Sequence, residues 1–285
     1  MLTLLLHFHL RLTTLGIILL ATPMKLYLHF ILEENHGFNN KNIFSSTTSF
    51  ILSFLSTSLP WIGFFYDNRT RLKEGPLRSR LEALATRCEF PPYSVLVREK
   101  SHRTYHSNAF CLSILCFNRI YLDDTLIKGY VSYSFEGDDE KGLNDEEVEA
   151  VLAHEIGHSR LMHFEKNLAI HLSIQFAVGC LFQYLKRYTD GTAAGSLIME
   201  ISKLLAIIIV NGYLGQVLHR FFVYQADAYA TELGYGEQLK KGLMKLNKDN
   251  LTLPFADSLY SAVHNSRPTT FHRLAAIDDL MAKMN

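Results

Sequence analysis

Uncharged apolar stretches alternate with strongly polar ones along the chain. The first two stretches lie at residues 12–32 and 43–66. The first contains one charged residue, Lys25, and the second contains none. At about 1.5 Å of rise per residue, a helix of either length crosses the ~30 Å hydrocarbon core of a bilayer. A signal sequence is less favoured for the first stretch, because Arg11 is the only basic residue before it and no small-residue cleavage site follows. We therefore expect N-terminal membrane segments within residues 1–66.

Two further apolar stretches occupy residues 167–185 and 197–218. The first has no charge and predicts a membrane helix. The second carries Glu200 and Lys203 near its start, which leaves it open between a membrane helix and a buried helix. Charges recur every few residues between 67 and 166, so this region should lie outside the bilayer.

The polar region contains patterns of both helix and strand. Leucines at helical spacing predict a helix near residues 77–90, and "YSVLV" at 93–97 predicts a strand. Asn144 with Glu147 three residues later resembles a helix cap, and further carboxylates follow in the first turn. A helix over about 145–165 is therefore expected, and residues after about 221 read as further helices. These patterns predict a mainly α fold with a small strand component.

The predicted helix carries the sequence "HEIGH", with His154, Glu155 and His158. Positions i and i+4 lie about 40° apart around a helix, so both imidazoles project from one face and can share a metal ion. The glutamate beside them can take a proton from a water molecule activated by that metal. This pattern indicates a zinc peptidase rather than a chance placement of two surface histidines.

A catalytic zinc ion needs a third protein ligand. The metzincin arrangement is excluded, because it needs a histidine at position 164, which is Phe164, and His163 would lie about 180° from His154 on a continuous helix. The other common solution is a glutamate on a later helix. The third ligand is therefore expected downstream of the HExxH helix.

Composition narrows the alternatives. The charges balance, with 28 Lys and Arg against 28 Asp and Glu, so nothing suggests nucleic acid as a partner. The four cysteines form no CxxC pair and are expected to be reduced thiols rather than zinc ligands or disulfides. Zinc held by histidines is the one cofactor expected.

Several blocks resemble the type I CAAX prenyl proteases, in the same order as in that family. They are "YHSNAF", "RIYLDDTL", "HEIGH", "FFVYQADAYATELG", "LMKLNKDNLTLP" and "HNSRPTTFHRL". The resemblance implies a multi-pass membrane protein of the endoplasmic reticulum with a gluzincin-like α+β metallopeptidase domain and a small edge-strand sheet. It also implies zinc, membrane lipid around the helices, and the tails of prenylated proteins as substrates. The peptidase domain would comprise residues 67–285, interrupted by membrane helices at about 167–185 and 197–218. The part before it is shorter than in the family, so the chain resembles a truncated or diverged member.

The resemblance assigns roles to particular residues. His154 and His158 would be metal ligands and Glu155 the general base. The family reads ExxxD after the last membrane span, where the glutamate is the third ligand and the aspartate supports the site. Here Asp227 matches the aspartate, but Val223 stands where the glutamate is expected. Asp227 is the nearest replacement, one turn along the helix, and Glu232 a more remote one.

Three other residues are expected to touch the substrate or the reacting carbonyl. Arg273 matches a family arginine and would support the oxyanion or the structure, while Arg267 stands where the family has a histidine that donates to the oxyanion. Asn108 precedes the edge strand on which an extended substrate would be held by main-chain hydrogen bonds, although a plain turn asparagine is the alternative.

Two functions follow. The protein is either a membrane endopeptidase, or a catalytically impaired relative that binds peptides or prenylated tails without cutting them, because of Val223. A quality-control membrane peptidase of the HtpX type shares the metal site but not the "LNKDN" block, which favours the CAAX side.

Overall fold

The computed structural model describes residues 68–101, 105–114, 117–130, 141–185, 193–253, 255–257, 261 and 265–284. The stretches 12–32 and 43–66, predicted as membrane segments, lie outside the described residues. The chain divides into two compact units, and all of α5 to α11 belongs to the second, which consists of Leu72–Val95, Ala109–Tyr121 and Leu143–Asn285.

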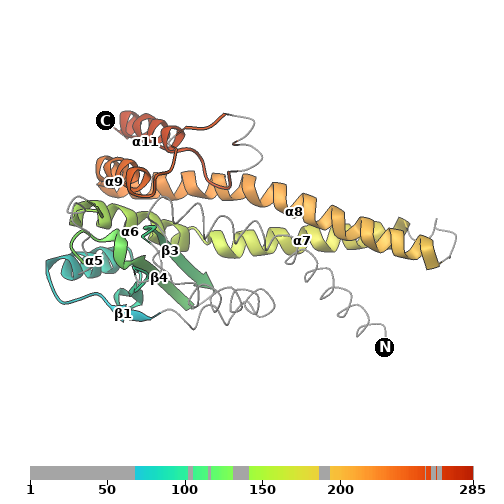
Figure 1. Ribbon diagram of the computed structural model, residues 1–285, viewed down its shortest axis with the longest axis horizontal. Coiled ribbons are helices and arrows are strands. Elements are labelled where there is room, and N and C mark those ends of the chain that lie inside the picture. The colour runs from blue at the N-terminus through green and yellow to red at the C-terminus, as the bar shows by residue number, and fades with distance from the viewer. Residues whose placement is uncertain are drawn as a thin grey trace. The chain divides into compact units, whose positions relative to one another are not determined.

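Helices dominate the described residues (Figure 1). The α-helices are α5 (Pro76–Arg87), α6 (Asp145–Arg160), α7 (His163–Leu185), α8 (Ala193–Ala230), α9 (Gly236–Asp249) and α11 (Thr270–Met284). A π-helical turn, Thr231–Tyr235, joins α8 to α9, and short 3₁₀ turns lie at Pro92–Ser94 and Asp124–Leu126. Gly234 within the π-helical turn has φ of 94°, a conformation that glycine adopts without steric cost.

Within the part of the chain that the structure describes, four short strands form one sheet: β1 (Arg69–Arg71), β2 (Val95–Arg98), β3 (Ala109–Ile114) and β4 (Phe117–Asp123). Their order is β1-β2-β4-β3, and β1 pairs antiparallel with β2, with Thr70 opposite Val97. β2 contains most of the strand predicted at 93–97. β3 is an edge strand of this sheet. The prediction of a mainly helical fold with a small edge-strand sheet is therefore confirmed.

The "RIYLDDTL" block folds within the first unit at its two aspartates. Asp123 is fully buried and its carboxylate lies 2.6 Å from the Arg98 guanidinium. Asp124 accepts hydrogen bonds from the backbone N–H of Lys100 and from the backbone N–H and hydroxyl of Ser101. Buried carboxylates are stable when they are paired and hydrogen-bonded in this way. These contacts account for the two adjacent aspartates without a catalytic role.

Helix α6 begins as its sequence predicts and ends earlier than expected. The backbone N–H of Asn144 donates to the Glu147 carboxylate at 2.8 Å, which completes a capping box. The helix ends at Arg160 instead of near residue 165. Met162 then takes a positive φ of 53°, and α7 starts at His163. A left-handed residue is incompatible with a continuing α-helix, so the chain turns sharply here.

The core of the second unit forms where α6 packs on α8, α9 and β3. Val148, Leu152 and Ile156 of α6 are fully buried, as is Ala226 of α8. A small residue at the crossing of α6 and α8 lets the two backbones approach, since a Cβ added at Gly157 would lie 3.1 Å from the Tyr229 side chain. α6 is thereby held against the helix that carries position 223.

Replacing Gly157 with valine is expected to lower the free energy of unfolding by about 1–3 kcal/mol, because the added methyl groups overpack the contact with Tyr229. Gly179→Val in α7 is the matched control, because a Cβ there meets nothing within 4 Å. Denaturant unfolding of both variants measures the difference. Equal stabilities would show that the two helices do not approach closely at Gly157.

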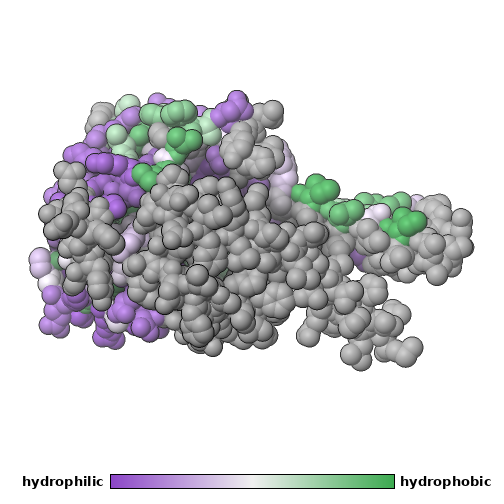
Figure 2. Space-filling view, viewed as in Figure 1, coloured by the Kyte–Doolittle hydropathy of each residue, from purple (hydrophilic) through white to green (hydrophobic). Residues whose placement is uncertain are grey.

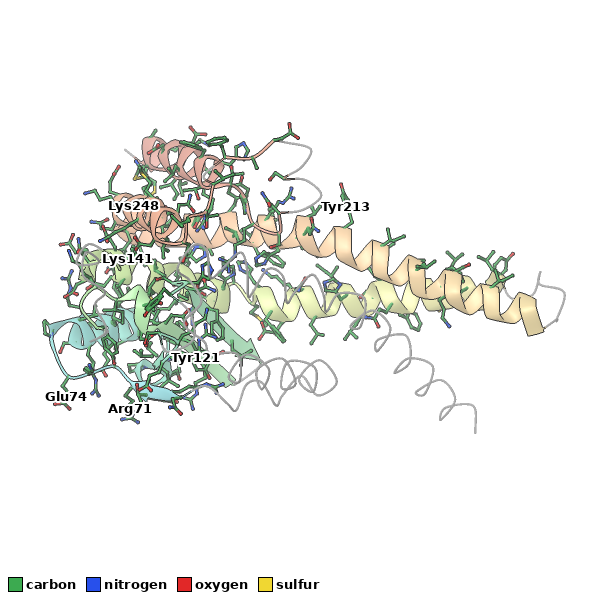
Figure 3. All side chains as sticks on the ribbon, in the orientation of Figure 1. Arg71, Glu74, Tyr121, Lys141, Tyr213 and Lys248 are labelled. Carbon is green, nitrogen blue, oxygen red and sulfur yellow. The ribbon has the colours of Figure 1, made fainter. Side chains whose placement is uncertain are left out.

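Helices α7 and α8 contain the apolar stretches 167–185 and 197–218 and lie side by side (Figure 1). They expose large apolar side chains, among them Leu172 and Phe176 on α7 and Ile209 and Tyr213 on α8. Figure 2 shows hydrophobic side chains, in green, along the part of the molecule that these helices form in Figure 1. In Figure 3 the Tyr213 side chain points away from α7. Within the described residues, no helix combines the length and the apolar character needed to cross a membrane.

Candidate active site

Helix α6 brings His154, Glu155 and His158 together on the side of the helix that faces α8 and β3. His154 and Glu155 are buried, with 8% and 9% of their surface exposed. The Nε2 atoms of the two histidines face each other at 3.3 Å, and their rings are nearly perpendicular, at 82°. The i, i+4 spacing predicted from the sequence therefore gives two converging imidazole nitrogens.

This spacing fits a metal ion. Two Zn–N bonds of about 2.0–2.1 Å at a tetrahedral angle place their nitrogens roughly 3.3–3.4 Å apart. The Nε2 atoms already have this separation, 3.3 Å. The two Nδ1 atoms lie within 3 Å of other side chains, Asp227 and His163, so both Nε2 atoms are available to one metal ion. The histidine pair thus fits zinc.

Asp227 of α8 holds His154 from the far side of its ring. One carboxylate oxygen, Oδ1, lies 2.8 Å from His154 Nδ1. The Arg273 guanidinium of α11 donates to both carboxylate oxygens, at 2.6 and 2.8 Å. A carboxylate on the second nitrogen of a ligating histidine fixes its tautomer and orientation. Asp227 and Arg273, 46 residues apart, thus form a buried support for His154.

The same contacts keep Asp227 charged and in place. Burial alone would raise the pKa of its carboxyl, but the charge and hydrogen bonds of Arg273, and then His154, bring it well below its usual range. Both oxygens are engaged, and the side chain is 1% exposed. Asp227 would have to give up these partners to replace the missing glutamate. Its geometry supports the first of the two roles predicted for it, the supporting acid.

His163 is a site residue that helical geometry had placed on the opposite side. Because α6 ends at Arg160, His163 turns back, and its Nδ1 lies 2.9 Å from His158 Nδ1. Its Nε2 lies 3.1 Å from the Gln225 side-chain oxygen, and its ring stacks on Phe222 at 4.4 Å. His163 therefore supports His158 as Asp227 supports His154.

Burial keeps this pair of histidines neutral. Loss of hydration lowers the pKa of His158 to about 2, with further contributions from His154 and His163. Loss of hydration also lowers the pKa of His163 to about 4, partly offset by its hydrogen bond to Gln225. A neutral imidazole is the form that binds a metal.

The metal-free protein should therefore lose stability as the pH falls below about 6.5. Both folded pKa values lie below the ordinary histidine value of 6.5, so the unfolded chain binds more protons in this range and stability is complete only above it. The expected slope is about 1.4 kcal/mol per pH unit for each histidine. Urea unfolding between pH 7.5 and 5 measures it, and His163→Asn should remove one histidine's share. A pH-independent midpoint would contradict the buried, neutral pair.

Position 223 offers no donor. Val223 of α8 is 2% exposed, and Phe222 and Ala226 of the same helix are buried as well. Glu232, the more remote candidate, has an exposed side chain on the π-helical turn. Within the described residues, no three His, Cys, Asp or Glu side chains form a ready metal-binding group. His154 and His158 thus give zinc two ligands, and position 223 does not give the third.

Glu155 is placed to act as a base. Loss of hydration raises the pKa of its carboxyl, while His154, Arg267, Arg273 and a backbone hydrogen bond from Cys111 of β3 oppose the rise. A raised carboxyl pKa suits proton transfer near neutral pH. Burial also raises the pKa of the Cys111 thiol far above its usual range, so this cysteine stays protonated and is no competing nucleophile.

Arg267 and Asn108 are predicted site residues with no described contact to the histidine pair. Arg267 has an exposed side chain, yet its charge acts on Glu155. Asn108 belongs to the first unit, where its backbone carbonyl oxygen accepts a hydrogen bond from the Asp123 N–H at 3.0 Å. It directly precedes β3. Their roles toward a substrate stay predictions.

A buried HExxH helix, supported by an Asp–Arg pair and flanked by an edge strand, defines the site of an HExxH peptidase. The profile of peptidase family M48 matches residues 71–281. The CAAX prenyl protease 1 homolog of Taenia solium is 31% identical over 330 aligned residues, covering 92% of this chain and 70% of that protein. Its counterpart in Mus musculus is 31% identical and covers 94% and 72%.

A solved structure agrees with these sequences. The crystal structure of Ste24p from S. mikatae superposes with a TM-score of 0.75 at 27% identity, covering 94% of this chain and 74% of that one. The chain therefore belongs to peptidase family M48. Its resemblance to the CAAX prenyl proteases, predicted from the short blocks, is confirmed.

Proposed function

We propose that the protein is a zinc-dependent membrane endopeptidase that cleaves the C-terminal tail of prenylated proteins. The observation that carries the proposal is the pair of Nε2 atoms 3.3 Å apart, with the Glu155 carboxylate on the adjacent residue. Supporting it, the curated relatives with about 30% identity are named CAAX prenyl proteases. A location in the endoplasmic reticulum membrane follows from the same resemblance.

Separate side chains of the site would bind the metal, transfer the proton and hold the metal ligands in position. His154 and His158 would hold the zinc, which when bound lowers the pKa of a water molecule toward about 7 and polarises the scissile carbonyl. Glu155 accepts the proton of the attacking water and returns it to the leaving amine. Asp227 and His163 hold the two imidazoles in position through their Nδ1 atoms. Arg273 is occupied by Asp227, so it supports the structure and leaves the oxyanion to Arg267.

The edge strand β3 is suited to hold the substrate. Within the described residues it is the last strand of the sheet, so it can pair with an extended peptide through main-chain hydrogen bonds, as in other β-augmentation complexes. β3 packs on α6, with Ser113 of the strand 3.0 Å from Ser159 of the helix. The Cys111 backbone on the same strand contacts Glu155. A peptide paired with β3 therefore runs past the proposed base.

Membrane association is supported by the surface of α7 and α8. Large apolar side chains are exposed on both helices: Leu168, Leu172 and Phe176 on α7, and Leu205 and Ile209 on α8. Contiguous apolar side chains on a surface mark contact with lipid or protein. A prenyl group is itself apolar, so such a surface is compatible with both the membrane and the lipidated substrate.

A second function is favoured by Val223. Without a donor at this position, the protein could bind prenylated tails without cutting them. In that case the tail would bind with the same affinity with or without zinc.

The test is cleavage of a farnesylated CAAX peptide by the full chain in detergent, beside the same peptide without the lipid. We expect cleavage of the farnesylated peptide, its loss with a zinc chelator, and its return on adding zinc. Binding of the farnesylated peptide without any cleavage at saturating zinc would overturn the enzyme and leave the binding function.

A further inference from the structure

The third ligand must come from a residue with a free donor, and most neighbours of the histidine pair have none. Asp227 uses both carboxylate oxygens on Arg273 and one of them on His154 as well. His163 uses one ring nitrogen on His158 and the other on Gln225. Val223 has no donor atom. Other side chains on the face of α8 that packs on α6 come next, because this helix carries position 223.

His219 lies on that face. It comes four residues before Val223 on the continuous helix α8, so it is about 40° away around the axis and about 6 Å along it. Side chains on a helix lean toward its N-terminus, so a glutamate at position 223 would extend over the preceding turn. That turn carries His219. A rotamer of His219 that points its ring toward the C-terminus of α8 would direct the imidazole to the region that the missing carboxylate would reach.

The surroundings of His219 agree with this position. Its side chain is partly buried. It interacts electrostatically with both His154 and His158. Burial lowers the pKa of its ring, as do Arg267 and His154, so the imidazole is neutral.

We propose that His219 is the third zinc ligand of this protein and takes the place of the glutamate that Val223 lacks. This inference rests on the proposed function, because it presumes that zinc is bound. Binding would require a change of the His219 side-chain rotamer, because the three imidazoles do not form a ready metal-binding group as they stand. Three imidazoles are an established ligand set for catalytic zinc.

The test is the number of imidazole ligands on zinc, measured by X-ray absorption at the zinc edge on the full chain in detergent, together with zinc affinity by chelator competition. The wild type should show three imidazoles. His219→Gln should show two and bind zinc more than about 100-fold more weakly, beyond the loss caused by supporting residues. His171→Gln, on the neighbouring helix α7, is the matched control and should change neither value.

Two further variants keep the test informative if His219→Gln folds poorly. Val223→Glu alone should lower the imidazole count from three to two, because the carboxylate displaces His219. The double variant His219→Gln, Val223→Glu should regain wild-type affinity. Zinc retained in His219→Gln with an unchanged spectrum would overturn the ligand assignment and leave the proposed enzyme intact. If the wild-type protein held no more zinc than His154→Ala, both the ligand assignment and the proposed zinc enzyme would be overturned.

Discussion

Glu155→Gln is expected to lower the rate of cleavage of a farnesylated peptide by about 10²–10⁴-fold, the usual contribution of a general base. The amide keeps the size of the side chain but cannot accept the proton of the attacking water. Zinc content should stay at the wild-type level, because His154 and His158 are unchanged. Steady-state cleavage assays with zinc analysis of the same samples measure both quantities.

The matched control for this prediction is Glu146→Gln, an exposed carboxylate in the first turn of the same helix. It should leave the cleavage rate within about twofold of wild type, as expected for a surface substitution. Cleavage by Glu155→Gln within tenfold of wild type would mean that another group takes the proton. That result would remove Glu155 from the mechanism while leaving the metal site untouched.

Arg273→Met is expected to lower the free energy of unfolding by about 3–5 kcal/mol, the cost of leaving one charge of a buried pair uncompensated. Asp227 is 1% exposed and loses both of its guanidinium hydrogen bonds in this variant. Removing the charge as well, in Asp227→Asn with Arg273→Met, should recover part of the loss. Denaturant unfolding of the metal-free wild type, the single variant and the double variant measures these differences.

An exposed arginine gives the control for Arg273→Met. Arg160 pairs with Glu89 at 3.2 Å, and the side chains of the two residues are 45% and 79% exposed. Arg160→Met should therefore cost less than about 1 kcal/mol. A similar loss in both arginine variants would show that Asp227 does not depend on Arg273 for its burial. A double variant less stable than Arg273→Met alone would also show that the buried Asp227 charge does not depend on Arg273.

Features set by neighbouring residues could be predicted from the sequence. The Asn144–Glu147 cap and the i, i+4 histidines depend only on spacing along one helix, and the structure has both. The edge strand and the family were predicted from short blocks of matching residues. Asp227 was placed near the site by the same resemblance, and its contact with His154 agrees with a supporting role.

Features set by a change of chain direction or by packing of distant helices could not be predicted. His163 reaches His158 only because Met162, which is not a glycine, takes a positive φ and ends α6. No residue pattern signals that turn; a third histidine five positions after the pair is the one hint. The partner of Asp227 depends on how α11 packs on α8, 46 residues away.

Position 223 separates this protein from the pattern of the CAAX prenyl proteases. Valine suits the apolar contact of α6 and α8, where it is 2% exposed, but it cannot bind a metal. The rest of the site keeps what a metal needs: two converging imidazoles, a partner on each second nitrogen, and a carboxylate beside them. A protein that had lost the metal would have no need of these contacts, which is why we favour the enzyme.

The central claim, that this protein binds a catalytic zinc ion, is tested most directly by the zinc content per molecule of the detergent-purified protein beside His154→Ala. We expect about one zinc per wild-type molecule and a large loss in the variant, because His154 provides one of the two facing Nε2 atoms. Equal, low zinc in the two proteins would contradict the claim and favour the alternative function, binding of prenylated tails without cleavage.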